Sequence, residues 1–185
     1  MPKVAVIYFS ATGTTAALAK AFRAGAVEFA EVTTCPINPA DIIEGRYRND
    51  AMLRTGDAAD AIAFGSSTYM GGPAAQFKAL ADATGERWIE QRWAGKLAAG
   101  FTTGSCPNGD QGGTLGYLTL FATQHGMLWC GLDIPGGHDT EGRNRLGTQI
   151  GLATHPRDGV LPQNDLDTAR HLGRRLARFA APRHG

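Results

Sequence analysis

Four hydroxyl side chains gather around one glycine near the start of the chain. Ser10, Thr12, Thr14 and Thr15 surround Gly13, directly after a short apolar run and before a stretch with helical spacing. The free N–H groups and the dipole of a helix start favour an anion, and hydroxyl donors assist without adding charge. The loop lacks the lysine of the GxxxxGK(S/T) loop that binds triphosphates. It therefore predicts a cradle for one terminal phosphate, with simple helix capping as the alternative.

A second segment carries side chains suited to a flat aromatic ligand. The stretch from Gly65 to Pro73 contains several glycines and presents Thr68, Tyr69 and Met70. A phenol ring and a thioether can both lie against such a ligand, although an isolated Tyr or Met is usually an ordinary core residue. We expect a ligand-binding loop here, with core packing as the alternative.

A third segment, from Thr102 to Gly113, is too rich in glycine to be packed regular structure. Such a loop can bring backbone N–H groups against the edge of a ligand. Cys106 lies within it without a partner cysteine, so an inert or merely exposed thiol is favoured over a redox-active one. The candidate ligand-binding residues of this segment are Thr102, Thr103, Gly104, Ser105, Cys106, Asn108 and Gly109.

The elements that must position these loops alternate along the chain. Short apolar runs predict strands at Val4–Phe9, Val27–Thr34, Ala61–Gly65, Leu97–Thr102 and Met127–Ile134. Helices are expected from Thr14 onward and over Pro73–Ala83, Thr114–His125 and Asp165–Phe179, with an insertion at Gly136–Arg157. This alternation predicts an α/β fold with a doubly wound five-stranded parallel sheet, order 2-1-3-4-5, and helices on both faces. The three loops then meet outside the carboxyl ends of the strands.

Length and composition limit the remaining possibilities. The 185 residues suit one domain, over 1–185. With 18 Lys and Arg against 17 Asp and Glu, the net charge of +1 gives neither the basic footprint of a nucleic-acid binder nor a strongly acidic surface. The three cysteines form no CxxC pair and the histidines show no ligand spacing, so no metal site is expected. No signal sequence or membrane-spanning run is evident, which predicts a soluble cytoplasmic protein.

The first loop resembles the FMN phosphate loop of flavodoxins, S-x-T-G-x-T. Further stretches in the same order make nearly the whole chain resemble the WrbA-type NAD(P)H:quinone oxidoreductases of the flavodoxin-like superfamily. These stretches are Phe77–Leu80, Asp82–Gly85 with Trp88, Gly95–Ala98, His125–Met127, Leu146–Thr148 and Asp158–Gly159. The resemblance implies that the three loops contact FMN and that His125 lies close to its ring. It also implies that Trp88 borders the pocket for nicotinamide and quinone, within reach of a neighbouring subunit's flavin.

The implied activity is oxidation of NADH or NADPH and two-electron reduction of quinones in a ping-pong cycle, because both substrates would use one pocket. The implied assembly is a homo-oligomer, either a dimer or a tetramer. Two alternatives stay open: a flavodoxin-type electron carrier and an FMN-binding regulatory module. Trp88 and Trp93 stand in a polar, irregular segment, which favours an interface; the alternative is that both indoles cover the sheet edge.

Overall fold

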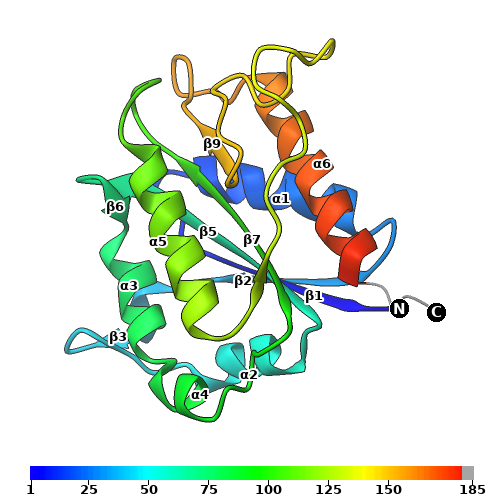
Figure 1. Cartoon of the computed structure of the whole chain (residues 1–185). Coiled ribbons are helices and arrows are strands. Elements are labelled where there is room, and N and C mark those ends of the chain that lie inside the picture. Colours follow the sequence, from blue (N-terminus) through cyan, green and yellow to red (C-terminus); the bar gives the residue numbers. More distant parts are fainter. Residues whose placement is uncertain (181–185) are drawn as a thin grey trace.

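The computed structural model describes residues 1–180 and is built around a twisted sheet (Figure 1). Hydrogen-bonded neighbours follow the order β2-β1-β5-β7-β8, and each of these pairs is parallel. The strands are β1 (Lys3–Tyr8), β2 (Glu31–Pro36), β5 (Ala61–Tyr69), β7 (Leu97–Thr103) and β8 (Leu128–Trp129). This is the predicted doubly wound order 2-1-3-4-5, which is therefore confirmed.

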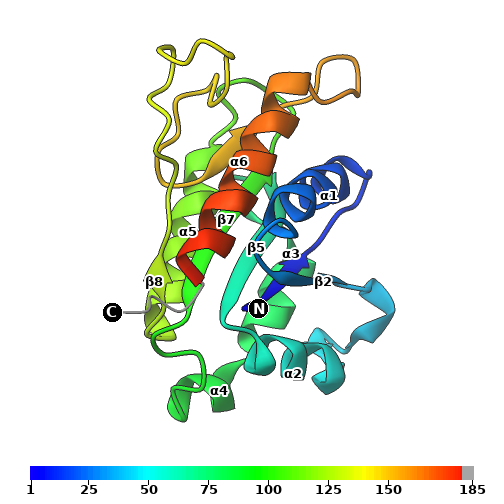
Figure 2. The same cartoon turned by 90° about the vertical axis from the view of Figure 1, so that its right-hand side faces the viewer.

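Helices cover both faces of the sheet, because β1, β5 and β7 are apolar on both sides. On one face lie α1 (Thr14–Ala26) and α6 (Gln163–Ala180), the side toward the viewer in Figure 2. They form one core, centred on Phe22, Phe101 and Leu172. The opposite core holds Phe64 and Phe121 and is covered by α2 (Asp50–Ala58), α3 (Ala75–Asp82) and α5 (Gln111–Gln124).

The second strand starts later than predicted. The expected strand over 27–34 is wrong at its start, because α1 continues to Ala26 and a turn follows before β2 begins at Glu31. The stretch after β2 also contains short elements that periodicity does not reveal. These are η1 (Pro39–Asp41), the β3 (Ile42–Ile43) and β4 (Arg46–Tyr47) hairpin, and α2 itself, whose first turn is capped by the Asn49 side chain.

The predicted loop from Gly65 to Pro73 is instead mostly strand. β5 continues to Tyr69, and β6 (Gly72–Pro73) folds back antiparallel against Thr68 and Tyr69. Only Met70 and Gly71 form the turn, with φ of 49° and 77°. Positive φ at both central positions matches the right-handed twist of the flanking strands, so a two-residue hairpin closes here.

The fifth strand position is filled twice. β8 pairs with the first residues of β7, and β9 (Leu152–Thr154) pairs in parallel with its last three. The predicted strand over Met127–Ile134 is thus shortened to two residues, and the expected insertion at Gly136–Arg157 returns to the sheet. Within residues 1–180, no helix combines the length and apolar character needed to cross a bilayer.

Candidate functional site

The first loop presents backbone donors at the start of α1. Gly13 adopts φ 92°, a left-handed conformation that suits glycine, and turns the chain into the helix. Ser10 Oγ accepts hydrogen bonds from the N–H groups of Gly13 and Ala16, both at 3.1 Å. Helix geometry leaves the N–H groups of Thr14 and Thr15 without intrahelical acceptors. Ser10 therefore caps the helix, which was the alternative interpretation of these hydroxyls. The backbone N–H groups of Thr14 and Thr15 are still left as donors for an anion.

Thr15 braces the loop from beneath. Its side chain is fully buried, and its hydroxyl lies 3.0 Å from Ser67 Oγ on β5. Thr12 and Gly13 are exposed, and Thr14 is partly exposed. The surface of the cradle is thus formed by residues 12–14, while the Thr15–Ser67 bond fixes it to the sheet. Ser67 gave no signal in the sequence beyond its position in the second segment.

A directed chain of hydroxyls joins the second and third segments. Thr102 Oγ1 donates to the Ser66 carbonyl at 2.7 Å, so it must accept from Thr68 Oγ1, 2.8 Å away. Thr68 has then used its proton and accepts from Thr114 Oγ1 at 2.8 Å. The carboxyl ends of β5 and β7 and the first turn of α5 are thereby locked together.

The end of β5 and the β5–β6 turn carry the two candidate ring contacts, Tyr69 and Met70. Tyr69 is half exposed, and Met70 is fully exposed at the tip of the hairpin. The alternative interpretation, that Tyr69 and Met70 are ordinary core residues, is therefore wrong. A methionine at positive φ is strained, and such strain concentrates at sites where it serves a ligand. The turn lies close to the start of α5, because Gly113 packs against the Gly71 carbonyl.

The third segment is an irregular loop only over residues 104–110. The expected bounds are wrong at both ends, because β7 continues to Thr103 and α5 already begins at Gln111. Gln111 holds it: the side-chain amide donates to the Cys106 carbonyl at 2.6 Å and accepts from Gly109 N–H at 2.8 Å. Gly104 N–H donates to the Thr154 carbonyl at 2.9 Å, which joins the loop to β9. Gln111 was missed in the sequence because nothing marks it as different from an ordinary helix-start residue.

Thr103 has an unsatisfied hydroxyl at the start of this loop. Its side chain is buried, and Oγ1 makes no hydrogen bond to any residue from 1 to 180. A buried hydroxyl without a partner is costly. The remaining predicted residues of the loop, Ser105, Cys106 and Asn108, are exposed. The loop therefore offers a polar group in need of a partner together with accessible polar side chains.

His125 and Trp88 lie elsewhere. They line a cavity of about 450 Å³ with Tyr117 and Phe121, and no residue of the three loops takes part. His125 follows the last residue of α5, whose 14 residues span about 21 Å from the third loop. Figure 1 places α4 (Gly85–Ile89), which carries Trp88, at the opposite end of the molecule from β6 and β9. His125 therefore lies at the end of α5 that points away from the three loops of its own chain.

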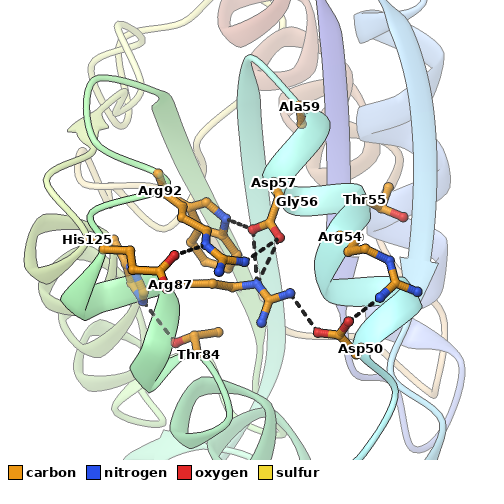
Figure 3. Close-up of polar contacts among 12 residues, drawn as sticks. Asp50, Arg54, Thr55, Gly56, Asp57, Ala59, Thr84, Arg87, Arg92 and His125 are labelled. Atoms are coloured by element: carbon orange, nitrogen blue, oxygen red, sulfur yellow. Dashed lines mark hydrogen bonds and ion pairs between the residues drawn. The ribbon is translucent and has the colours of Figure 1, made fainter.

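The tautomer of His125 follows from its partner. Thr84 Oγ1 donates to the Ala81 carbonyl at 2.7 Å, so it accepts from His125 Nε2, 2.9 Å away (Figure 3). Nδ1 is then a bare acceptor, and within residues 1–180 it has no partner. The imidazole is buried, which lowers its pKa from 6.5 to about 4. At neutral pH, Nδ1 of His125 is therefore an unprotonated acceptor.

Trp93 is not part of an exposed interface. Its indole is fully buried, lies 4.6 Å from the His125 ring between centroids, and donates to Asp57 Oδ1 at 2.8 Å. The expectation for two exposed indoles is thus wrong for Trp93. Trp88, by contrast, is 50% exposed. The polar sequence around Trp93 misled because its partner Asp57 comes from a distant helix.

Comparisons with known proteins identify the family of the chain. The family model described as NADPH-dependent FMN reductase matches residues 2–131. Over its full length the chain is 34% identical to flavodoxin FldP of Pseudomonas aeruginosa, all of which is covered. It is also 34% identical to an NAD(P)H dehydrogenase (quinone) of Archaeoglobus fulgidus, with 97% of this chain and 98% of the relative covered.

Among solved structures, a WrbA-like flavodoxin from Agrobacterium tumefaciens matches with a TM-score of 0.74 and 36% identity. The match covers 97% of this chain and 98% of that one. The flavodoxin-like fold and the resemblance to WrbA-type proteins are therefore confirmed. With a family model that spans more than half of its residues, the chain belongs to the NADPH-dependent FMN reductase family.

Proposed function

We propose that this protein is an FMN-dependent oxidoreductase that takes hydride from NADH or NADPH and reduces quinones by two electrons. The observation that carries the proposal is the convergence of three braced loops at the carboxyl edge of the sheet, with an uncharged anion cradle in the first. Full-length relatives named NAD(P)H dehydrogenase (quinone) support the same activity.

FMN fits the residues present at this edge. The first-turn N–H groups of α1 suit one terminal phosphate. The unsatisfied Thr103 hydroxyl and the exposed Tyr69 and Met70 suit the polar edge and the face of a flavin. The residues that we assign to FMN are Ser10, Thr12, Gly13, Thr14, Thr15, Thr68, Tyr69, Met70, Thr102, Thr103, Gly104, Ser105, Cys106, Asn108 and Gly109. Of these, Thr15 and Thr102 act as buried braces.

Bound FMN supplies the redox chemistry, since a flavin accepts hydride from a nicotinamide and passes two electrons to a quinone. The chain orients the ring by the hairpin turn and the third loop, and the cradle fixes the phosphate. The nicotinamide and the quinone would share one pocket on bound FMN, so the nicotinamide would have to leave before the quinone enters. Steady-state assays with a small quinone should give parallel double-reciprocal lines, whereas intersecting lines would contradict the shared pocket.

We further propose a homo-oligomer, a dimer or a tetramer, in which the cavity at Trp88 and His125 meets the FMN of a neighbouring subunit. The separation of this cavity from the loops of its own chain supports the idea, since Trp88 can border a flavin only across an interface. Trp88, Ile89 and Leu120 supply exposed apolar surface around it. Size-exclusion chromatography with light scattering tests the assembly, and a monomer with full quinone activity would contradict it.

An electron carrier is the second candidate, because a full-length relative is named flavodoxin. Carriers dock through a strongly acidic face, and a net charge of +1 does not favour one. The decisive assay follows NADH and NADPH oxidation with and without a quinone. Oxidation that depends on FMN and quinone supports the enzyme, and the absence of any nicotinamide oxidation supports a carrier or regulatory module. We also propose that residues 1–185 form one domain and that the protein is cytoplasmic.

A further inference from the structure

An ion pair between the buried Arg87 and the partly buried Asp57 anchors the short helix that carries Trp88. We propose that Asp57 and Arg87 are positioning residues for the cavity formed by Trp88 and His125, and thereby for the quinone. This inference rests on the proposed function for its substrate. Neither Asp57 nor Arg87 belongs to the three loops that we assign to FMN, and neither is a candidate site residue of the sequence analysis.

α4 cannot hold its own place. It has five residues, far fewer than an isolated helix needs, and its N-cap residue Thr84 makes no side-chain capping bond. Trp88 and Ile89 are exposed, and Arg87 is the one residue of α4 that is buried. The helix is therefore fastened by a guanidinium group and not by an apolar face.

The guanidinium of Arg87 is held on two sides by α2 (Figure 3). Its Nε lies 3.0 and 3.1 Å from the two carboxylate oxygens of Asp57, and a terminal nitrogen lies 2.7 Å from Asp50 Oδ1. The Arg87 side chain is only 5% exposed. A planar guanidinium held by two carboxylates has a fixed orientation as well as a fixed position, which an ammonium group cannot reproduce.

Asp57 also reaches the other wall of the cavity. It accepts from Trp93 Nε1, the Trp93 ring packs against His125, and His125 donates to Thr84 at the start of α4. Asp57 is thus the point where the supports of both walls meet. Lys96 keeps α2 in place beneath it by donating to the carbonyls of Gly56 and Ala59, at 3.0 and 2.6 Å.

Consecutive helical residues point about 100° apart, because a turn takes 3.6 residues. Arg87 points to α2, so Trp88, next in sequence, is turned toward the cavity that it lines. A change in how Arg87 is held must rotate or loosen Trp88, while the FMN loops at the far end of α5 keep their contacts. The expected signature is a raised quinone KM with unchanged FMN affinity.

The test uses the full-length, FMN-loaded protein with 5-fluorotryptophan at its three tryptophans. Arg87→Lys keeps the positive charge and the Asp57–Trp93 bond but loses the planar guanidinium that spans Asp57 and Asp50. Asp57→Asn removes the negative charge of the Asp57 carboxylate. Asp139→Asn is the control for Asp57→Asn, because Asp139 also accepts hydrogen bonds from an arginine, Arg143, at 2.8 and 3.0 Å, outside this cluster. The ¹⁹F signal of Trp88, assigned by Trp88→Phe, reports its position directly.

In Arg87→Lys we expect the Trp88 signal to shift or broaden while the Trp93 signal stays, and the quinone KM to rise about tenfold, as for loss of a charge-assisted hydrogen bond. The FMN dissociation constant and kcat should stay within about twofold of wild type. An unchanged Trp88 signal, or a changed signal with an unchanged KM, overturns the proposal. If the Asp57→Asn variant does not fold, the Arg87→Lys variant alone tests the positioning of Trp88. A wild type that reduces no quinone would refute the proposed function, and the Trp88 signal would still test the positioning.

Discussion

Gly113 lies where the third segment meets the β5–β6 turn, and Gly113→Ala tests how these loops are held. A Cβ at this position would lie 2.2 Å from the Gly71 carbonyl oxygen, where real contacts stay above 3.0 Å. The turn must therefore retreat by about 1 Å, and overpacking of this kind costs about 1 to 3 kcal/mol. The backbone of Gly113 is already helical, so alanine returns at most about 1 kcal/mol of helix propensity.

Because the strained turn carries Tyr69 and Met70, we expect most of the displacement to fall on the FMN site. The FMN dissociation constant should rise about tenfold, which corresponds to about 1.4 kcal/mol. Flavin fluorescence titration measures the affinity, and urea unfolding of the FMN-free protein measures stability. Gly116→Ala is the control on the same helix, since nothing lies within 4 Å of its Cβ. If Gly113→Ala matched this control in both measurements, the close approach of residue 113 to Gly71 would affect neither FMN affinity nor stability, and the reasoning would be refuted.

Further predictions concern single side chains. Thr14→Ala should weaken FMN by about 1 to 3 kcal/mol with little loss of stability, whereas Thr15→Ala should lower both affinity and unfolding free energy, because Thr15 is a buried brace. Met70→Asn should stabilise the FMN-free protein by up to about 1 kcal/mol in urea unfolding, since asparagine tolerates positive φ, yet weaken FMN in titration. Trp88→Ala should raise the quinone KM in steady-state assays and leave the FMN dissociation constant unchanged. The lowered pKa of buried His125, about 4, means that the unfolded chain binds more protons between pH 6.5 and 4. Stability should be complete above pH 6.5 and fall by up to about 3 kcal/mol toward pH 4, and His125→Gln should remove this part of the decline in urea unfolding at a series of pH values.

Local chemistry explains which parts of the site could be read from the sequence. The cradle depends on residues adjacent along the chain, so Gly13 and its hydroxyl neighbours identify both the turn and the start of α1. The hydroxyl chain through Thr68 could not be foreseen, because its links to Thr102 and Thr114 join separate elements. The hairpin turn was hidden for a related reason: nothing in a methionine indicates positive φ.

The far end of the molecule could not be read from the sequence for a different reason. The position of His125 depends on the length and direction of α5, which carries it away from the loop where the helix starts. Burial of Trp93 depends on Asp57, 36 residues earlier in the chain. Sequence patterns report a residue's own neighbours, and they do not report a single charged partner on another helix.

Because β8 and β9 both pair with β7, the segment between them should tolerate insertions and deletions. β8 and β9 hydrogen-bond to the same strand, β7, so the chain between them leaves and rejoins the sheet along one edge. Neither strand's register depends on the length of the excursion. The entropy of closing such an excursion grows slowly with its length. Residues 137–143 should therefore accept a grafted peptide or a shortened turn, provided that Gly136 stays, because a Cβ there would lie 2.4 Å from Gly147 Cα. Asn144 must also keep its bond to the Ile134 carbonyl, and Arg145 its pair with Asp165. The segment is a natural place to attach a new binding epitope to this scaffold without moving the three loops that we assign to FMN.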